Sequence, residues 1–221
     1  MLKERLIMAI LPLFTTPSGM AECEYVIKKS RFIAVLYEVV SEEEIAARLQ
    51  SARKNYWDAS HNCYAYCLGA RAELQKASDD GEPSGTAGKP ILEVLKAHSL
   101  TNALIIVTRY FGGTKLGTGG LIRAYGHSAA LVVEAANIAD HILCDVLTVK
   151  TTYSSVDSIE RLATDCSAVI TDRSFTDSVS FALFLPSDTT DSFLQKLSDA
   201  TNGSAVVEKG TPRILPQIRK K

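Results

Sequence analysis

The sequence predicts an α+β protein built from two domains that meet near residues 138–141. Eight of the 13 glycines fall between Gly81 and Gly120, so unusual backbone geometry is concentrated in the first part of the chain. Helical and strand periodicities alternate along the whole chain. After Asn137 glycine almost vanishes, and the patterns follow the order βαββαβ, which is typical of a ferredoxin-like domain.

The first domain begins with β-favouring composition over residues 21–40, which predicts two strands. Ser41 followed three residues later by Glu44 is the pattern of a capping box, and apolar residues at helical spacing predict a helix over 42–55. The same periodicities predict a strand at 62–69, a loop from Ser78 to Gly88, a helix at 90–98, a buried strand at 104–107 and a helix at 118–137. The last helix is expected to bury Leu121, Ile122, Tyr125, Ala129, Val132 and Val133.

The second domain is predicted from shorter patterns. They indicate a strand at 142–153, a helix at 157–165, strands at 167–174 and 178–185, a helix at 189–200 and a strand at 204–209. The expected organisation is therefore an N-terminal extension at 1–20, a first domain at 21–139, a second domain at 140–210 and a basic, frayed tail at 211–221.

Composition limits the classes of partner. The formal net charge of -1 argues against a surface that coats polyanions as a whole, so any nucleic-acid contact must use a local patch. Five cysteines without a repeating spacing suggest buried free thiols in a reducing compartment. Lys3 and Arg5 before the apolar run Leu6–Phe14 resemble a signal peptide only faintly, and no run approaches the roughly 20 residues of a membrane span. A cytoplasmic protein is expected.

A glycine-rich segment from Arg109 to Gly120 follows the buried strand and leads directly into a helix. Glycines permit close backbone approach, and exposed N–H groups at a helix N-terminus favour anions. No Asp or Glu occurs from Val94 to Val133, so sequence neighbours do not neutralise the cations. This pattern predicts a phosphate site, and the rings of Tyr110, Phe111 and Tyr125 are candidates for base stacking. The predicted site residues are Arg109, Tyr110, Gly112, Gly113, Lys115, Gly117, Thr118, Gly119, Gly120 and Arg123.

Two alternatives remain open for this segment. The glycines could simply make a tight strand-to-helix turn with solvated cations, or the phosphate could belong to a small molecule. Arg123 lies one to two turns into the helix and could instead pair with an acidic residue of an earlier loop.

That earlier loop carries three carboxylates within four residues. Its candidate residues are Asp79, Asp80, Glu82, Ser84 and Thr86. The oxygen ligands could bind Mg²⁺, but an acidic turn in which Asp caps backbone N–H groups is the favoured interpretation.

His61, Cys63 and Cys67 lie on one face of the strand predicted at 62–69, because side chains alternate with a period of two. Zinc needs four converging ligands, and the remaining cysteines lie outside this region. The pattern therefore favours small buried thiols, with His61 as the one polar candidate of the group. No metal and no cofactor are expected.

Several long strings carry a resemblance to a known family. They are DDGEPSGTAGKP at 79–90, RYFGG at 109–113 and KLGTGGLIRAYG at 115–126, with SRFIA at 30–34 and HNCYAY at 61–66. Together they resemble the signature of the IMPACT/YigZ family, densely over residues 21–138.

The resemblance implies a fold and a cellular context. The first domain would share its α/β fold with a small-subunit ribosomal protein, domain IV of elongation factor G and the GHMP kinases, and bacterial members add a ferredoxin-like C-terminal domain. Eukaryotic members regulate translation through an activator of an initiation-factor kinase, using an extra N-terminal domain. Only about 20 residues precede the first predicted strand here, so that kinase-linked mechanism is not expected to apply.

The leading hypothesis is a non-catalytic regulator of translation that associates with RNA or the ribosome through the basic glycine-rich segment. Its partners would be RNA or the ribosome, and a protein could bind through the second domain. One rival is a small-molecule phosphotransferase or hydrolase that uses Asp79, Asp80 and Lys115 around a phosphate. Another is a protein-interaction scaffold. Salt-sensitive binding would distinguish RNA from both.

Overall fold

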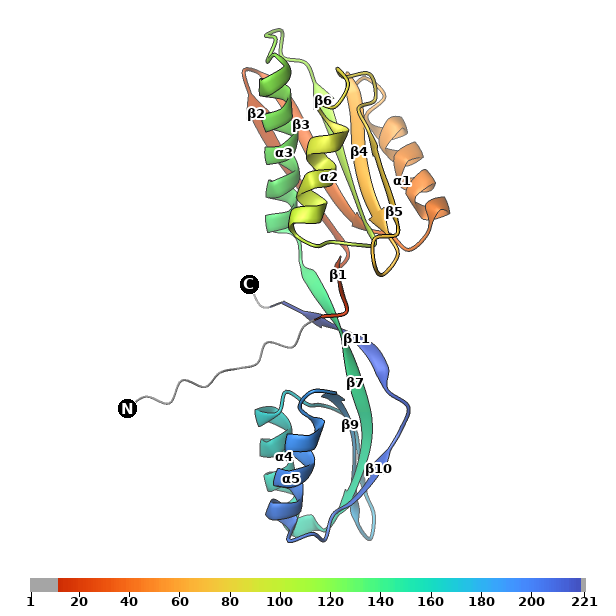
Figure 1. Ribbon diagram of the computed structural model, residues 1–221, viewed down its shortest axis with the longest axis vertical. Coiled ribbons are helices and arrows are strands. Elements are labelled where there is room, and N and C mark those ends of the chain that lie inside the picture. Colours follow the sequence, from red (N-terminus) through yellow and green to blue (C-terminus); the bar gives the residue numbers. More distant parts are fainter. Residues whose placement is uncertain (1–11, 220–221) are drawn as a thin grey trace, which may run out of the picture. The chain divides into compact units, whose positions relative to one another are not determined.

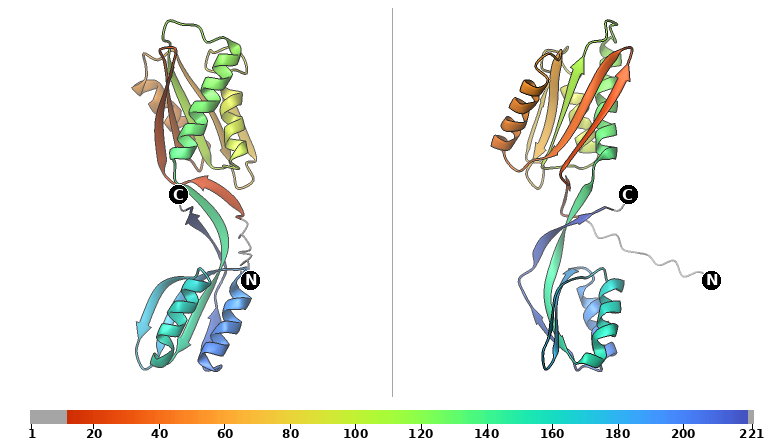
Figure 2. Two further views of the ribbon diagram at one scale, coloured as in Figure 1. Left: turned by 90° about the vertical axis from the view of Figure 1, so that its left-hand side faces the viewer. Right: turned by 180° about the vertical axis from the view of Figure 1, so that it is seen from behind.

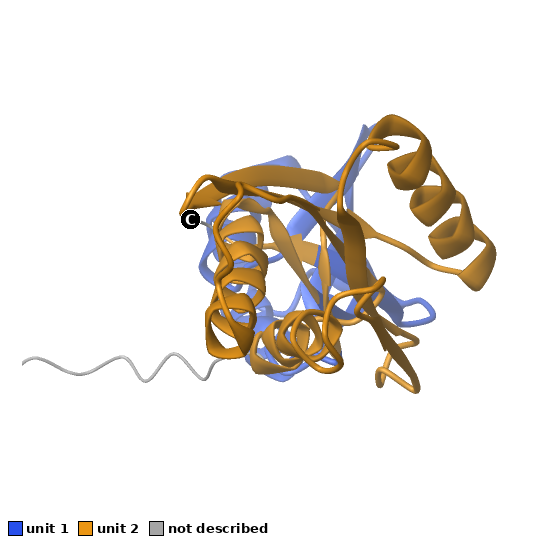
Figure 3. Ribbon diagram, turned by 90° about the horizontal axis from the view of Figure 1, so that it is seen from above, with its two compact units in different colours: residues 1–13, 141–216 blue, residues 14–140, 217–221 orange. Residues whose placement is uncertain are grey.

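The computed structural model of the chain describes residues 12–219 (Figure 1). Two compact units divide between residues 140 and 141 (Figure 3). The N-terminal unit contains residues 14–140 together with the chain from residue 217, and the C-terminal unit contains residues 141–216. Lys3, Arg5 and most of the apolar run after them, which resembled a signal peptide, lie outside the described residues.

The N-terminal unit is an antiparallel sheet with helices on both faces. The strands of this sheet are β2 (Met20–Ile27), β3 (Ser30–Glu38), β4 (His61–Leu68), β5 (Leu74–Ser78) and β6 (Ala103–Tyr110). The short strand β1 (Phe14–Pro17) precedes them and pairs instead with β7 (Ile138–Thr151). The helices of the N-terminal unit are α1 (Glu42–Asn55), α2 (Gly88–Ala97) and α3 (Thr118–Ala135). The sheet has the strand order β2-β3-β6-β4-β5, and each neighbouring pair is antiparallel.

The sheet is buried on both sides because helices cover both of its faces. Helices α2 and α3 pack on one face and α1 on the other (Figure 2). The central strand β6 alternates between these two cores: Ile105 faces α2 and α3, and Leu104 and Ile106 face α1. This confirms the prediction that the apolar run at 104–107 is a strand buried on both faces.

The first helix begins where its capping residues predicted. The Ser41 hydroxyl accepts the N–H of Glu44 at 3.2 Å, and the Glu44 carboxylate accepts the N–H of Val40 at 3.1 Å. These two bonds satisfy N–H groups that have no partner within the helix. The helix spans Glu42–Asn55, the range predicted from the sequence.

The C-terminal unit has the predicted element order βαββαβ. Its elements are β7 (Ile138–Thr151), α4 (Val156–Asp165), β8 (Val169–Phe175), β9 (Val179–Pro186), α5 (Thr190–Thr201) and β10 (Val206–Lys209), with a short 3₁₀ turn at Tyr153–Ser155. The strand order is β10-β7-β9-β8, all antiparallel, and α4 and α5 pack on the sheet around Leu147, Phe181 and Phe193. The assignment of either unit to a named fold type stays a prediction.

Three strands were not predicted. Strand β1 lies inside the segment expected to be an extension, and β5 is exposed along its length, so it lacks the apolar alternation that marks a half-buried strand. The tail at 211–221 was expected to be frayed, and this was wrong: β11 (Arg213–Ile218) pairs with β7. Arg219 then holds Asp140 with two bonds of 2.8 Å. Proline in this segment had suggested fraying, but edge strands tolerate it.

The glycine at position 112 has a packing role that can be tested. A Cβ on Gly112 would overlap the backbone of Lys29 and Ser30 in the turn between β2 and β3, whereas a Cβ on Gly119 would meet nothing within 4 Å. We expect Gly112→Ala to lower the free energy of unfolding by about 1–3 kcal/mol, as other overpacked sites do. Urea unfolding followed by circular dichroism measures it.

The matched control is Gly119→Ala, which places the same methyl group in open space and favours the helix. It should leave stability unchanged or slightly higher. Equal destabilisation by both substitutions would contradict a packing role for Gly112.

Candidate functional site

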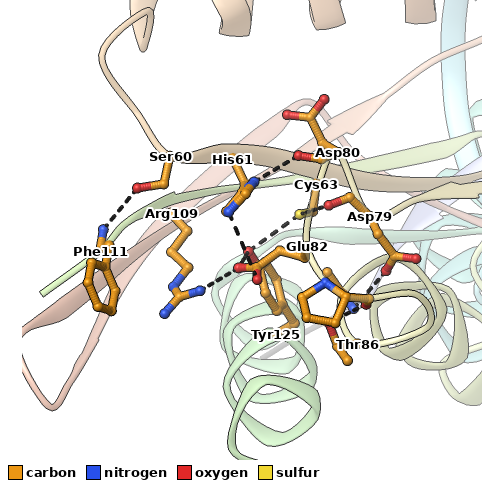
Figure 4. A network of polar contacts seen from close by, with 12 residues as sticks. Ser60, His61, Cys63, Asp79, Asp80, Glu82, Thr86, Arg109, Phe111 and Tyr125 are labelled. Carbon is orange, nitrogen blue, oxygen red and sulfur yellow. Dashed lines mark hydrogen bonds and ion pairs between the residues drawn. The ribbon is translucent and has the colours of Figure 1, made fainter. Parts of the chain in front are cut away.

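A cavity of about 560 Å³ lies where the two glycine-rich segments approach each other, at the end of β6 and the start of α3. Figure 4 shows the polar contacts of several residues that line it, among them His61, Glu82 and Arg109. Residues from β4, the first glycine-rich segment, β6 and the second glycine-rich segment line it. Those with polar or aromatic side chains are Ser60, His61, Glu82, Arg109, Phe111, Lys115 and Thr118. The cavity therefore brings together residues from both of the segments that the sequence singled out.

Arg109 occupies the inner wall of this cavity. The strand registers put it between Phe32 on β3 and His61 on β4. Its Nη1 donates to Oε1 of Glu82 at 2.5 Å, and both side chains are at most 7% exposed. The guanidinium carbon lies 5.6 Å from the centroid of the Phe111 ring. Nε of Arg109 is buried and has no hydrogen-bond partner among the residues that the structure describes.

Tyr125 and Cys63 complete the surroundings of the Glu82 carboxylate. The Tyr125 hydroxyl donates to Oε1 of Glu82 at 2.8 Å, and the Cys63 thiol donates to the carbonyl of Asp79 at 3.0 Å. Burial is the main cause that raises the pKa of Cys63 to about 12. Burial, followed by the neighbouring Cys63 and Glu82, also raises the pKa of Tyr125 far above its ordinary value. Both groups therefore stay protonated at neutral pH and act as donors.

His61 presents one ring nitrogen to Glu82. Its Nδ1 lies 2.8 Å from the carbonyl oxygen of Asp80. A carbonyl only accepts, so Nδ1 carries the hydrogen, and Nε2 of the neutral ring has a lone pair. Nε2 lies 4.0 Å from Oε2 of Glu82, so protonation of His61 would form an ion pair there.

Asp79 organises the first glycine-rich segment. Its Oδ1 accepts the N–H groups of Ala87 and Gly88 at 2.9 Å each, and its Oδ2 accepts that of Gly85 at 2.8 Å. Burial alone would raise the pKa of Asp79, but these three N–H groups lower it further than burial raises it. This is the acidic turn that the sequence favoured over a Mg²⁺ site.

The other candidates in the first segment have local roles. Asp80 accepts the N–H of Asn62 at 2.7 Å. The Thr86 hydroxyl donates to the carbonyl of Pro83 at 2.7 Å, and Ser84 is exposed. Asp80 and Thr86 therefore shape the loop, and none of the three residues lines the cavity.

The second glycine-rich segment ends in an uncapped helix. Gly117 has φ +74° and is the residue before α3, and no side chain caps the first turn. Gly117 and Thr118 line the cavity, so the N-terminus of α3 borders it. Lys115 lines it as well and is exposed. This arrangement matches the geometry predicted for an anion site, and the binding itself stays a prediction.

Three expectations about individual residues were wrong. Tyr125 was a candidate for base stacking, but it is fully buried and bonded to Glu82. Arg123 was a candidate partner of the acidic loop, but Glu82 pairs with Arg109. Arg123 instead lines a second cavity with Lys28 and His127. Ile122, expected in the core, is 42% exposed.

The remaining glycines of the second segment and Tyr110 do not line this cavity. Gly113 and Gly119 have open space where a Cβ would stand, whereas at Gly120 a Cβ would lie 3.0 Å from the side chain of Leu116. The Tyr110 hydroxyl donates to Oδ1 of Asp58 at 2.9 Å, outside the cavity lining.

Between residues 12 and 219, no group of three or more His, Cys, Asp or Glu could hold a metal ion. Cys63 and Cys67 lie in the same core on one face of β4, as their spacing predicted, and all five cysteines are free. No helix in the described part of the chain is long and apolar enough to cross a membrane.

Comparison with known proteins gives two matched regions and several relatives. Residues 28–133 match the Impact N-terminal domain, and residues 149–204 match a domain of unknown function, DUF1949. IMPACT family member YvyE of Bacillus subtilis (strain 168) is 38% identical over 197 residues, covering 89% of this chain and 91% of that protein. IMPACT family member YigZ of Escherichia coli (strain K12) is 36% identical over 180 residues, covering 80% and 88%.

A crystal structure of a hypothetical protein is similar along most of the chain. It has a TM-score of 0.56 and 32% sequence identity, and the alignment covers 88% of this chain and 95% of the other. Because the alignment covers 88% of this chain, it includes elements of both units.

Removing the charge of Glu82 tests the buried pair. Glu82→Gln leaves Arg109 with a buried charge that no carboxylate compensates, so we expect a loss of about 3–5 kcal/mol in the free energy of unfolding. Chemical denaturation measures it. The control is Glu24→Gln, because Glu24 forms a solvent-exposed pair with Arg31. If the two variants lose similar amounts of free energy of unfolding, burial does not determine the cost of removing a carboxylate charge.

Asp79 should make stability depend on pH. Its pKa is lowered in the folded state, so its contribution is present above the unfolded pKa of about 3.9 and is lost as the pH falls through the folded value. We expect Asp79→Asn to have a lower free energy of unfolding than the parent at neutral pH. This difference between parent and variant should become smaller below about pH 4. Exposed Asp177→Asn is the control. If parent and Asp79→Asn differ in stability by the same amount at pH 3 and pH 7, the charge of Asp79 does not stabilise the fold.

Proposed function

The chain belongs to the IMPACT family, and on that premise we propose that it is a translation-regulator-like protein that binds RNA through the cavity at the start of α3. In this proposal a phosphate group of the RNA enters the cavity, and the protein catalyses no reaction on it. Family membership supports the link to translation, because eukaryotic members of the family regulate translation. The geometry of the cavity supports the link to a phosphate.

The observation that carries the proposal is the unpaired Nε of Arg109. A buried N–H without an acceptor is unfavourable, and a ligand oxygen that reaches it would remove this cost. The uncapped N-terminus of α3 borders the same cavity and also lacks a side-chain acceptor. Arg109 and the N-terminus of α3 therefore border one cavity, which suits an anion with several oxygens.

The charges around the cavity decide which residues attract the anion. Glu82 neutralises Arg109 at 2.5 Å, so Arg109 contributes directed N–H groups more than net charge. Lys115 is exposed and forms no ion pair within the described residues, so it supplies the free positive charge. Lysine acts on phosphate as a flexible point charge, whereas arginine acts through fixed geometry.

The cellular setting follows from the proposal. RNA or the ribosome would be the partner of the cavity, in the cytoplasm, and a protein partner would bind the C-terminal unit. The kinase-linked mechanism of the eukaryotic members is not part of the proposal.

One observation favours a second candidate function, the binding of a small phosphorylated molecule. The cavity is large enough for a small molecule, and His61 and the Glu82 carboxylate both border it. A small phosphorylated ligand would also satisfy Arg109 and the helix N-terminus. Isothermal titration with nucleotides and sugar phosphates separates the candidates, because a small-ligand site would saturate without RNA.

Lys115→Ala tests the proposed function. We expect weaker binding of a short single-stranded RNA and a slope of log affinity against log salt that is smaller by about 0.7, the value for one lost phosphate contact on a single strand. Fluorescence anisotropy of labelled RNA across a salt series measures both. The melting temperature should not change, because the side chain is exposed.

The control is Lys209→Ala, which removes an exposed lysine from β10 in the C-terminal unit. It should leave affinity and slope as in the parent. If both variants bind RNA like the parent, Lys115 is not part of an RNA site. If the parent itself binds no RNA at low salt, the proposed function is wrong.

A further inference from the structure

Phe111 offers a ring face at the mouth of the cavity. It follows the last residue of β6, lines the cavity and is 50% exposed. The Arg109 guanidinium lies 5.6 Å from its ring centroid. The N–H of Phe111 donates to Ser60 Oγ at 3.2 Å, which fixes the backbone at this position. The backbone is therefore anchored at this position, and the ring lies beside Arg109 with half of its surface open to solvent.

Trp57 lies on the loop that adjoins the same strand end. It is the only tryptophan of the chain and is 81% exposed, although tryptophan is highly buried on average. Three hydrogen bonds attach its loop to the end of β6. Ser60 N–H donates to the Arg109 carbonyl at 2.9 Å, the Tyr110 hydroxyl donates to Asp58 at 2.9 Å, and the third is the Phe111–Ser60 bond.

Half of the Phe111 surface and most of the Trp57 surface are exposed, so packing within the fold uses only part of either ring. Burying an aromatic side chain stabilises a fold, so leaving Trp57 in solvent forgoes that stabilisation. A partner that carries both phosphate groups and flat aromatic rings would use the cavity and the rings together. Nucleic acid has this chemistry, and each of its bases has a face that can stack.

We infer that the site binds single-stranded RNA, with one base stacked on Phe111 and another on Trp57 while a phosphate occupies the cavity. The inference rests on the proposed function and specifies its partner. Unpaired bases can leave their neighbours and stack on aromatic side chains, whereas the bases of a duplex are already stacked inside the helix. The site should therefore prefer unpaired to paired RNA and should accept any base sequence.

The test uses the single tryptophan as a reporter. The full-length protein is titrated with a short unstructured RNA, with the same RNA annealed to its complement, and with an abasic oligonucleotide of the same length. Trp57 emission and the anisotropy of labelled RNA are recorded together. With the unpaired RNA, we expect Trp57 emission to be quenched and to reach its plateau at the same RNA concentration as the anisotropy. The duplex and the abasic strand should bind about tenfold more weakly.

Substitutions then separate stacking from charge. Phe111→Ala and Trp57→Ala should each weaken binding by about tenfold without changing the salt slope, because stacking displaces no counterions. Phe111→Leu, which keeps an apolar side chain without a π face, should behave like Phe111→Ala. Phe175→Ala is the matched control, because Phe175 is 54% exposed on β8 in the C-terminal unit.

The outcomes distinguish the two proposals. Equal affinity for unpaired and abasic strands, or parent-like binding by both ring variants, overturns the stacking inference and leaves phosphate binding standing. Tighter binding of duplex RNA also overturns it. The absence of binding to every oligonucleotide overturns the proposed function together with the inference.

Discussion

A carboxylate that is nine-tenths buried must be compensated, because nearby groups have to replace the water that it loses. Glu82 meets this requirement with Arg109 at 2.5 Å and the Tyr125 hydroxyl at 2.8 Å. Those partners come from β6 and α3, and His61 on β4 lies 4.0 Å away. Four separate segments therefore meet at one carboxylate, and the cavity exists in the space that they enclose.

The glycines bring the two loops close enough for this meeting. At Gly88 a Cβ would lie 2.6 Å from the backbone nitrogen of Ser78, and at Gly112 it would overlap the backbone of Lys29. Each loop is thus pressed against a neighbouring strand or turn. Asp79 then fixes the first loop by accepting three N–H groups, and the second loop runs into α3. Close packing shapes both loops, and the Asp79 carboxylate fixes the first of them.

Local patterns predicted most of the elements, because helices and half-buried strands have their own periodicities. Ser41 and Glu44 marked the start of α1, and the alternation of Cys63 and Cys67 gave the buried face of β4. Strand β5 was missed because none of its residues is fully buried. The pairing of Glu82 with Arg109 could not be predicted, because it joins residues 27 positions apart and depends on tertiary distance. Tyr125 had a helical spacing that indicated burial, and this signal should have outweighed its aromatic character.

The neutralised arginine also determines how the site would select a ligand. With Glu82 beside it, Arg109 adds little to the long-range field, so attraction must come from Lys115 and the partial charge of the α3 terminus. Such a field is weak, in agreement with a net charge of -1 for the whole chain. Discrimination then depends on contacts of short range, namely directed N–H groups inside the cavity and ring faces at its mouth. A polyanion without accessible rings would gain only the electrostatic part of this interaction, and salt would remove that part first.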